Sequence, residues 1–431
     1  GVGSYTGFTA TNRNGNLEES GFAFNTIQGG LSLSNSTFGY FNNYRVEGFG
    51  DANTLTSDID FIDFENSTIG GLKINNAITQ GVTLKNSSIV SQFYLGGNAR
   101  EGQKYDIITG VSTLNKYSAY TVKGGVTLDN LTILGKDITN TSTPTLGIGL
   151  SFKSSQGTSI DPLYTPIMTL SDRYNIMRTL GKANGFFATG SLEGDIDIKS
   201  STLNAFVLAG GYFNNSSLVV DKSTLGAAFL AGNTIGNSTI NQYANLKDIA
   251  IKDSKITDIL MIYNGDTIDN IDIKNSYIEH FNPSQQFQPN ASLHPLVKNL
   301  TIDNSTIMSL NAAGFNYDTI AITNSTLLPG GRTLFQDGNT FISNSIEHQQ
   351  YPLPGMISNG TIKNLTIKDS VLDSLLGVPD DVHTLRLENV HGHTFYSGLI
   401  NRYHYYIQDP KSIASTFLQT LNNVTLGMFQ A

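Results

Sequence analysis

The chain contains no cysteine and no tryptophan, and only 14% of its 431 residues are charged. The lack of cysteine excludes disulfide frameworks, thiolate metal sites and cysteine nucleophiles. The low charge fraction excludes a coiled coil and charge-driven disorder. With 26 Lys and Arg against 35 Asp and Glu, the net charge is -9. Such a chain repels phosphate backbones and anionic lipid, so we expect no nucleic-acid partner.

No apolar run approaches the roughly 18 residues that a transmembrane helix needs. Phosphate-binding glycine loops, the Gly-x-Ser-x-Gly elbow and the glycine–aspartate calcium repeat are also missing, so we expect no cofactor and no metal ion. The polar remainder is rich in Asn, Ser and Thr, as in β-rich extracellular proteins. Together with the absence of cysteine, this composition favours a secreted protein or one on the bacterial cell surface.

One eight-residue pattern recurs along the chain: aliphatic, any, aliphatic, any, Asn or Asp, Ser, any, aliphatic. Clear copies begin at Leu31, Val82, Ile249, Ile271, Leu300, Ile320, Leu365 and Leu385, and weaker ones lie at 64–69, 126–133, 196–203, 218–225 and 341–346. The usual spacing is about 20–22 residues, which is one coil of a parallel β-helix and too short for helical repeats. The sequence therefore predicts an all-β fold, a single-stranded right-handed parallel β-helix.

Alternation along a strand places the first and third residues of the pattern on the inner side. The same counting predicts that the Asn or Asp at position five also points inward at a turn, where its amide bonds to the neighbouring coils. The predicted ladder consists of Asn35, Asn86, Asp253, Asn275, Asn304, Asn324, Asn344, Asp369 and Asn389. Inward-facing residues cannot carry sugars, which argues against glycans at the Asn-x-Ser/Thr sites such as Asn66, Asn86, Asn130 and Asn304.

The pattern divides the chain into four parts: coils in 1–135, an insertion projecting from the solenoid in 136–190, regular coils in 191–400, and a terminal capping segment in 401–431. Within the insertion, 171–180 resembles a short capped helix. A second short helix is predicted at 411–421, after Pro410, although 421–426 also fits a further copy of the pattern. Some 16–19 coils would form a rod roughly 80–90 Å long at about 4.8 Å per coil.

A weak catalytic candidate combines Asp380 and Asp381 with His383 and His391, because paired carboxylates near histidines can cleave glycosides. The group resembles the Asp-Asp pair and Gly-His-Gly motif of polygalacturonases. However, His391-Gly392-His393 replaces Gly-His-Gly, no Arg-Ile-Lys follows, and only ten residues separate Asp381 from His391. We therefore interpret these residues as a turn with surface histidines and expect no catalytic residue. The paired histidines also lack a third ligand other than His383.

Aromatic clusters are the remaining feature, because exposed rings stack on sugars or anchor protein partners. Packing inside the coils is the commoner role for such rings. The candidate binding residues are Tyr174 and Arg178 in the predicted insertion, and Tyr403, Tyr405 and Tyr406 near the C-terminal end.

The aliphatic-x-aliphatic-x-Asn-Ser copies in 29–135 and 191–390 resemble the passenger regions of Gram-negative autotransporters and two-partner-secreted surface proteins, which include large adhesins and vacuolating-toxin-like proteins. The resemblance implies a monomeric, non-enzymatic rod that is attached in its precursor to an outer-membrane translocator. Its loops would contact a host-cell protein or glycan receptor, or other copies of the protein, in virulence-associated adhesion. Two alternatives stay open: a phage tailspike or polysaccharide-degrading β-helix, and a structural spacer.

Overall fold

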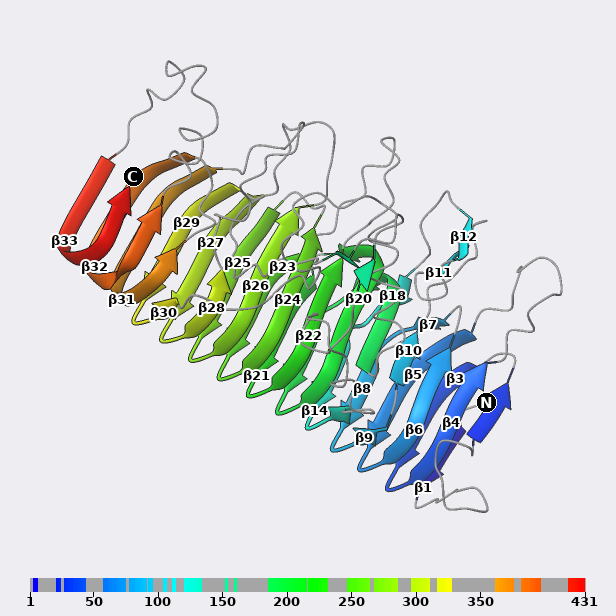
Figure 1. The fold of residues 1–431 in the computed structure, drawn as a ribbon. Coiled ribbons are helices and arrows are strands. Elements are labelled where there is room, and N and C mark those ends of the chain that lie inside the picture. Colours follow the sequence, from blue (N-terminus) through cyan, green and yellow to red (C-terminus); the bar gives the residue numbers. More distant parts are fainter. Residues whose placement is uncertain are drawn as a thin grey trace.

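The computed structural model describes residues 3–6, 21–24, 27–43, 57–74, 77–90, 92–95, 104–106, 111–113, 120–133, 152–153, 159–160, 185–214, 216–231, 246–263, 267–285, 296–310, 316–327, 361–375, 381–396 and 418–430. Every regular element among them is a strand, and none is a helix that could cross a membrane. Twenty-nine strands join in one continuous sheet whose pairings are parallel. The strands stack into an elongated solenoid (Figure 1), which confirms the predicted parallel β-helix.

Each coil has a leading strand and a following strand. A two-residue corner joins them, except in the first coil, where 7–20 lie between Gly3–Thr6 and Gly21–Phe24. The leading strands are β1 (Gly3–Thr6), β3 (Gln28–Ser34), β5 (Ser57–Glu65), β7 (Ala77–Thr79), β8 (Val82–Lys85), β13 (Tyr120–Val122), β14 (Val126–Asp129), β19 (Ile196–Lys199), β21 (Ser216–Asp221), β23 (Leu246–Lys252), β25 (Thr267–Lys274), β27 (Leu296–Asp303) and β29 (Asn316–Thr323). The following strands are β2 (Gly21–Phe24), β4 (Thr37–Asn43), β6 (Thr68–Ile74), β9 (Ser88–Ile89), β10 (Gln92–Leu95), β15 (Thr132–Ile133), β20 (Thr202–Asn214), β22 (Thr224–Ala231), β24 (Lys255–Tyr263), β26 (Tyr277–Gln285), β28 (Thr306–Leu310) and β30 (Thr326–Leu327).

The remaining strands depart from this scheme. β18 (Gly185–Glu193) runs from the end of one coil into the start of the next, and β31 (Thr361–Leu375), β32 (Asp381–Tyr396) and β33 (Leu418–Gln430) continue through the corner. Two antiparallel pairs lie outside the continuous sheet: β11 (Lys104–Asp106) with β12 (Val111–Thr113), and β16 (Phe152–Lys153) with β17 (Ser159–Ile160).

The corner is built on a backbone conformation that few residues adopt. Its first residue has a positive φ near 50° in all thirteen described corners, the left-handed region that Asn and Asp tolerate best. These residues are Asn35, Asn66, Asn86, Asn130, Ser200, Lys222, Asp253, Asn275, Asn304, Asn324, Asp369, Asn389 and Asn423. Its backbone N–H donates to a carbonyl of the next coil, as Asn275 does to Asp303 at 3.1 Å. The corner therefore turns the chain and holds two coils in register.

The inward-facing corner residue is the second one, a serine in ten of the thirteen described corners and an aliphatic residue in the others, so the predicted inward orientation of Asn was wrong. Ser254 and Ser276 are 4% and 5% exposed, whereas Asp253 and Asn275 are exposed. A left-handed residue breaks the strand alternation, which shifts the inward position by one. The Ser254 hydroxyl donates to its own coil at the Lys252 carbonyl (2.6 Å) and accepts the backbone N–H of Ser223 from the preceding coil (3.1 Å).

The interior is a continuous apolar column. The aliphatic residues on both sides of the corner are buried, as the pattern predicts. Aromatic rings stack beside them along the following strands. Phe186 lies between Phe93 and Phe206, with ring centroids 5.1 and 5.5 Å away and nearly parallel planes. Phe93 and Phe186 belong to adjacent coils although the long segment 134–184 separates them in the sequence. The core therefore continues without a break at this segment.

The described residues form fewer coils than predicted. The thirteen described corners, together with the first coil of β1 and β2, give a stack on the order of 65 Å at about 4.8 Å per coil. The difference arises because long segments between coils add no coil of their own. Asn86 donates its N–H directly to Asp129, and Asn324 to Lys368, so the corners of Asn86 and Asn130 belong to adjacent coils, as do those of Asn324 and Asp369. Asn344 lies outside the described residues, and its place in the ladder stays a prediction.

The helix predicted at 411–421 was wrong over 418–421, because these residues open β33, which pairs with β32. Residues 185–190 of the predicted insertion belong to β18 and thus to the solenoid. The predicted helix at 171–180 lies outside the described residues, and the division of the chain into four parts stays a prediction.

Replacing Ser254 with Ala should leave the buried N–H of Ser223 without its acceptor. We expect the free energy of unfolding to fall by about 1–3 kcal/mol in urea denaturation. The control is Thr224→Ala, which removes an exposed hydroxyl one residue beyond the neighbouring corner and should change stability by less than about 0.5 kcal/mol. Equal effects of the two substitutions would contradict the role of the serine column.

Candidate functional site

The side chains of the corner residues form an outward-facing amide ladder. Asn304 Nδ2 donates to Asn275 Oδ1 at 2.8 Å, and Asn275 Nδ2 donates to Asp253 Oδ1 at 3.0 Å. A second run starts at Asp369, which accepts from Asn389 at 2.7 Å, and Asn389 accepts from Asn423 at 2.8 Å. Bonds between neighbouring corner side chains are thus present in these runs, although the side chains face solvent. Asn324 departs from the prediction, because its Nδ2 donates to Asp303 Oδ1 and not to Asn304.

The same bonding bears on the glycosylation sites. Asn66, Asn130 and Asn304 each use the side-chain nitrogen that would carry a glycan as a donor to the preceding coil. The sequence argued against glycans because it placed these Asn side chains inside the solenoid, and that reason was wrong. A glycan at these sites would replace one of the two N–H groups of an amide that the ladder holds in place.

Charges alternate in sign from coil to coil in the column just before the corner. Its first members are Glu65, Lys85, Asp129, Lys199, Asp221 and Lys252. Opposite charges on neighbouring strands stabilise this order of coils. If one coil were skipped in the stack, residues of like charge would become neighbours. Hydrogen bonding to Asp197, aided by the charges of Asp197, Asp129 and Asp221, raises the pKa of Lys199. One adjacent pair carries like charges, Lys252 beside Lys274, and the uncharged Thr323 separates Asp303 from Lys368.

A second alternating column lies earlier in the leading strands, where the burial alternation breaks at 269–270 and the strand bends. It contains Lys247, Asp269, Lys298, Asp318 and Lys363, with ion pairs of 2.6 Å between Lys298 and Asp269 and 2.5 Å between Lys363 and Asp318. Hydrogen bonding to Asp269 and its charge raise the pKa of Lys298.

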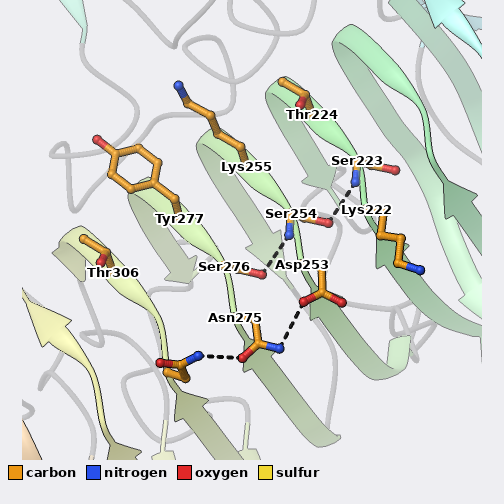
Figure 2. A pocket seen from close by; sticks show the side chains of 11 residues that line it. Lys222, Ser223, Thr224, Asp253, Ser254, Lys255, Asn275, Ser276, Tyr277 and Thr306 are labelled. Atoms are coloured by element: carbon orange, nitrogen blue, oxygen red, sulfur yellow. Dashed lines mark hydrogen bonds between the residues drawn. The ribbon is translucent and has the colours of Figure 1, made fainter.

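A shallow open furrow of about 460 Å³ runs along the corners of four successive coils. Figure 2 shows its two walls on either side of Ser223, Ser254 and Ser276. The corner residues Lys222, Asp253, Asn275 and Asn304 form one wall, and the first residues of the following strands, Thr224, Lys255, Tyr277 and Thr306, form the other. Each lining residue carries a polar group, and the furrow's length follows the axis of the rod.

The furrow coincides with departures at two positions of the repeat, the first residue of the following strand and the corner residue. Threonine occupies the first position of most following strands, but Lys255 and Tyr277 replace it here. Lys222 and Asp253 likewise replace the corner Asn of most other coils. Lysine has no short polar side chain to support a left-handed backbone, so Lys222 is held against its local preference. Departures from a local rule that bring no gain in stability are typical of functional sites.

Lys255 and Tyr277 contact each other across the coil boundary. The ammonium nitrogen lies 5.5 Å from the ring centroid of Tyr277, within the range of a cation–π interaction. Desolvation by burial, aided by the charge of Glu279, raises the pKa of the Tyr277 phenol. The phenol therefore stays protonated at neutral pH.

The predicted site residues are not brought together at the furrow. Asp381 opens β32 beside Thr361, exposed His383 follows Lys363 in the second alternating column, and exposed His391 lies beyond the Asn389 corner. Asp380, Tyr174, Arg178, Tyr403, Tyr405 and Tyr406 lie outside the described residues. Within the described ranges, no three His, Asp or Glu side chains converge as metal ligands would.

The sequence reasoning missed the furrow and both charge columns. Their signal was present in the aligned copies of the pattern, because the same offset carries Lys and Asp in turn. The copies containing Lys222, Lys255 and Tyr277 also depart visibly from the Asn and Thr of their neighbours. Comparison with protein-family models, curated proteins and solved structures finds no match for the chain.

Lys222→Asn should stabilise the protein, because Asn tolerates the positive φ of 48° at this corner better than Lys. We expect a gain of about 0.5–1 kcal/mol in urea denaturation. The reverse exchange, Asn275→Lys, should destabilise by a comparable or larger amount, since it also removes the bond to Asp253. A loss of stability in Lys222→Asn would show that the lysine is favoured locally.

Proposed function

We propose that the chain is a bacterial surface or secreted adhesive rod, of the autotransporter or two-partner-secreted passenger type, that presents segments of variable length for binding to cells. The observation that supports this proposal is the position in each coil at which the coils differ in length. Every described corner from Asn35 to Asn423 has the same two-residue form, whereas the connection from a following strand to the next leading strand ranges from Asn215 alone to 328–360. The edge of the rod that is formed by the corners is therefore constant, and the edge that is formed by these connections varies in length.

This asymmetry favours presentation over a plain spacer, which needs no variation in length. The segments 44–56, 96–119, 232–245, 286–295 and 328–360 all leave the stack at the same junction, and 134–184 leaves within the following-strand side of its coil. Short connections at 264–266 and 311–315 prove that long segments are not needed to close a coil. In this account the additional residues serve partner binding.

The experiment replaces 134–184 with the short connection Asn264-Gly265-Asp266. A triple replacement treats 96–119 in the same way and exchanges 331–360 for the five residues of 311–315, so that no coil becomes shorter than the one from Asn304 to Asn324. We expect saturable binding of the purified chain to epithelial cells or bacteria to fall at least tenfold in the triple replacement, with the largest single loss at 134–184. The β-sheet circular dichroism should persist, because the flanking coils pair directly.

The matched control replaces only 232–245 with the same connection. Undiminished binding by the triple replacement would favour a structural spacer. The polysaccharide-degrading alternative is tested by incubation with acidic polysaccharides and measurement of new reducing ends. Turnover that Asp381→Ala abolishes would contradict the adhesive function.

A further inference from the structure

We propose that the furrow binds a linear acidic glycan, a sugar chain bearing carboxylate or sulfate groups, independently of the variable segments. Lys222 and Lys255 would contact the anionic groups, Tyr277 would pack against a sugar ring, and the amides of Asn275 and Asn304 would bond its hydroxyls. This site lies at the constant edge of the rod, so it does not depend on the adhesive function of the variable edge.

The first argument is local charge. Lys222, Lys252, Lys255 and Lys274 lie on three successive coils of a chain whose net charge is -9. Lys252 and Lys274 are the one adjacent pair of like charges along the column before the corner. Among the described residues, their carboxylate contacts are long, 3.8 Å from Lys252 to Asp253 and 3.8 Å from Lys274 to Asp303. Within the described residues, Lys222 and Lys255 form no ion pair. An anionic ligand would relieve this repulsion.

The second argument is the combination of side chains. Tyr277 is half-buried and carries a protonated phenol, which suits a ring that stacks on a sugar while its hydroxyl bonds to it. Asn275 and Asn304 are exposed amides held in fixed orientation by the ladder, so little entropy is lost when they bind. Asp253 accepts from Asn275 and lies at the same wall, where it can also accept a sugar hydroxyl.

The third argument is shape. The furrow is open and long rather than enclosed, and its lining side chains repeat with the coil spacing of about 4.8 Å. An extended polymer that lies along the rod meets equivalent groups at regular intervals. A compact small molecule would be buried on one side only and would gain little from such a site.

The test uses isothermal titration of the full chain with a heparin-derived oligosaccharide, an oligogalacturonate and a neutral maltooligosaccharide. We expect binding of the acidic oligosaccharides that weakens as salt rises, and no measurable binding of the neutral one. The two acidic probes distinguish sulfate from carboxylate as the preferred group. No binding of either acidic probe, or equal binding of the neutral one, would overturn the proposal.

The decisive variant is K222N/K255T/Y277T, which gives each position the residue that most other coils have there. Because these residues fit their columns, we expect no loss of thermal stability and at least a tenfold loss of affinity. Lys255→Thr alone should flatten the salt dependence, whereas Tyr277→Thr should weaken binding at every salt concentration. The control Lys85→Thr removes an exposed lysine elsewhere on the rod and should bind as the parent does. Unchanged affinity in the triple variant would refute the site.

The variant that lacks the three long segments should keep this affinity even if it no longer binds cells. The failure of one proposal is therefore distinguishable from the failure of the other.

Discussion

The structure depends on a left-handed residue that is followed, in ten of the thirteen described corners, by a buried serine. The positive φ reverses the chain direction within two residues, and the backbone N–H of that residue bonds to the next coil. The serine hydroxyl closes the inner side by joining its own coil to the preceding one. Since each corner uses its neighbour's groups, an isolated coil would leave them unsatisfied, and stability requires stacking.

Once the corners are stacked, each side-chain position becomes a column along the rod. The aliphatic positions then form a continuous core, the corner amides a ladder, and the positions before the corner a series of alternating charges. The charge columns make register specific, which aliphatic ladders alone do not. The furrow lies where these columns change composition together, at Lys222, Lys255 and Tyr277. Its polar walls and surplus of lysine are what distinguish it from the other corners.

Strand alternation and the repeat spacing were enough to predict the parallel β-helix, its aliphatic ladders and most of its corners. Simple alternation failed at the corner, because a left-handed residue shifts the inward position from Asn to Ser. Counting residues also failed as a measure of coils, since Asn324 bonds directly to the Lys368 coil across 328–360. The furrow was not predicted because it depends on residues that meet across different copies of the pattern. Lys255 and Tyr277, for example, are register partners on adjacent coils.

The most direct measurement of coil stacking uses the absence of native cysteine. Thr326 and Val371 are register partners in adjacent coils although 45 positions apart, whereas Thr306 pairs with Thr326 and is two coils from Val371. The account predicts that Thr326→Cys with Val371→Cys forms a disulfide under mild oxidation, because adjacent strands lie within disulfide reach. Thr306→Cys with Val371→Cys, at about twice that separation, should not. Efficient cross-linking of the second pair, or none of the first, would contradict the stacking.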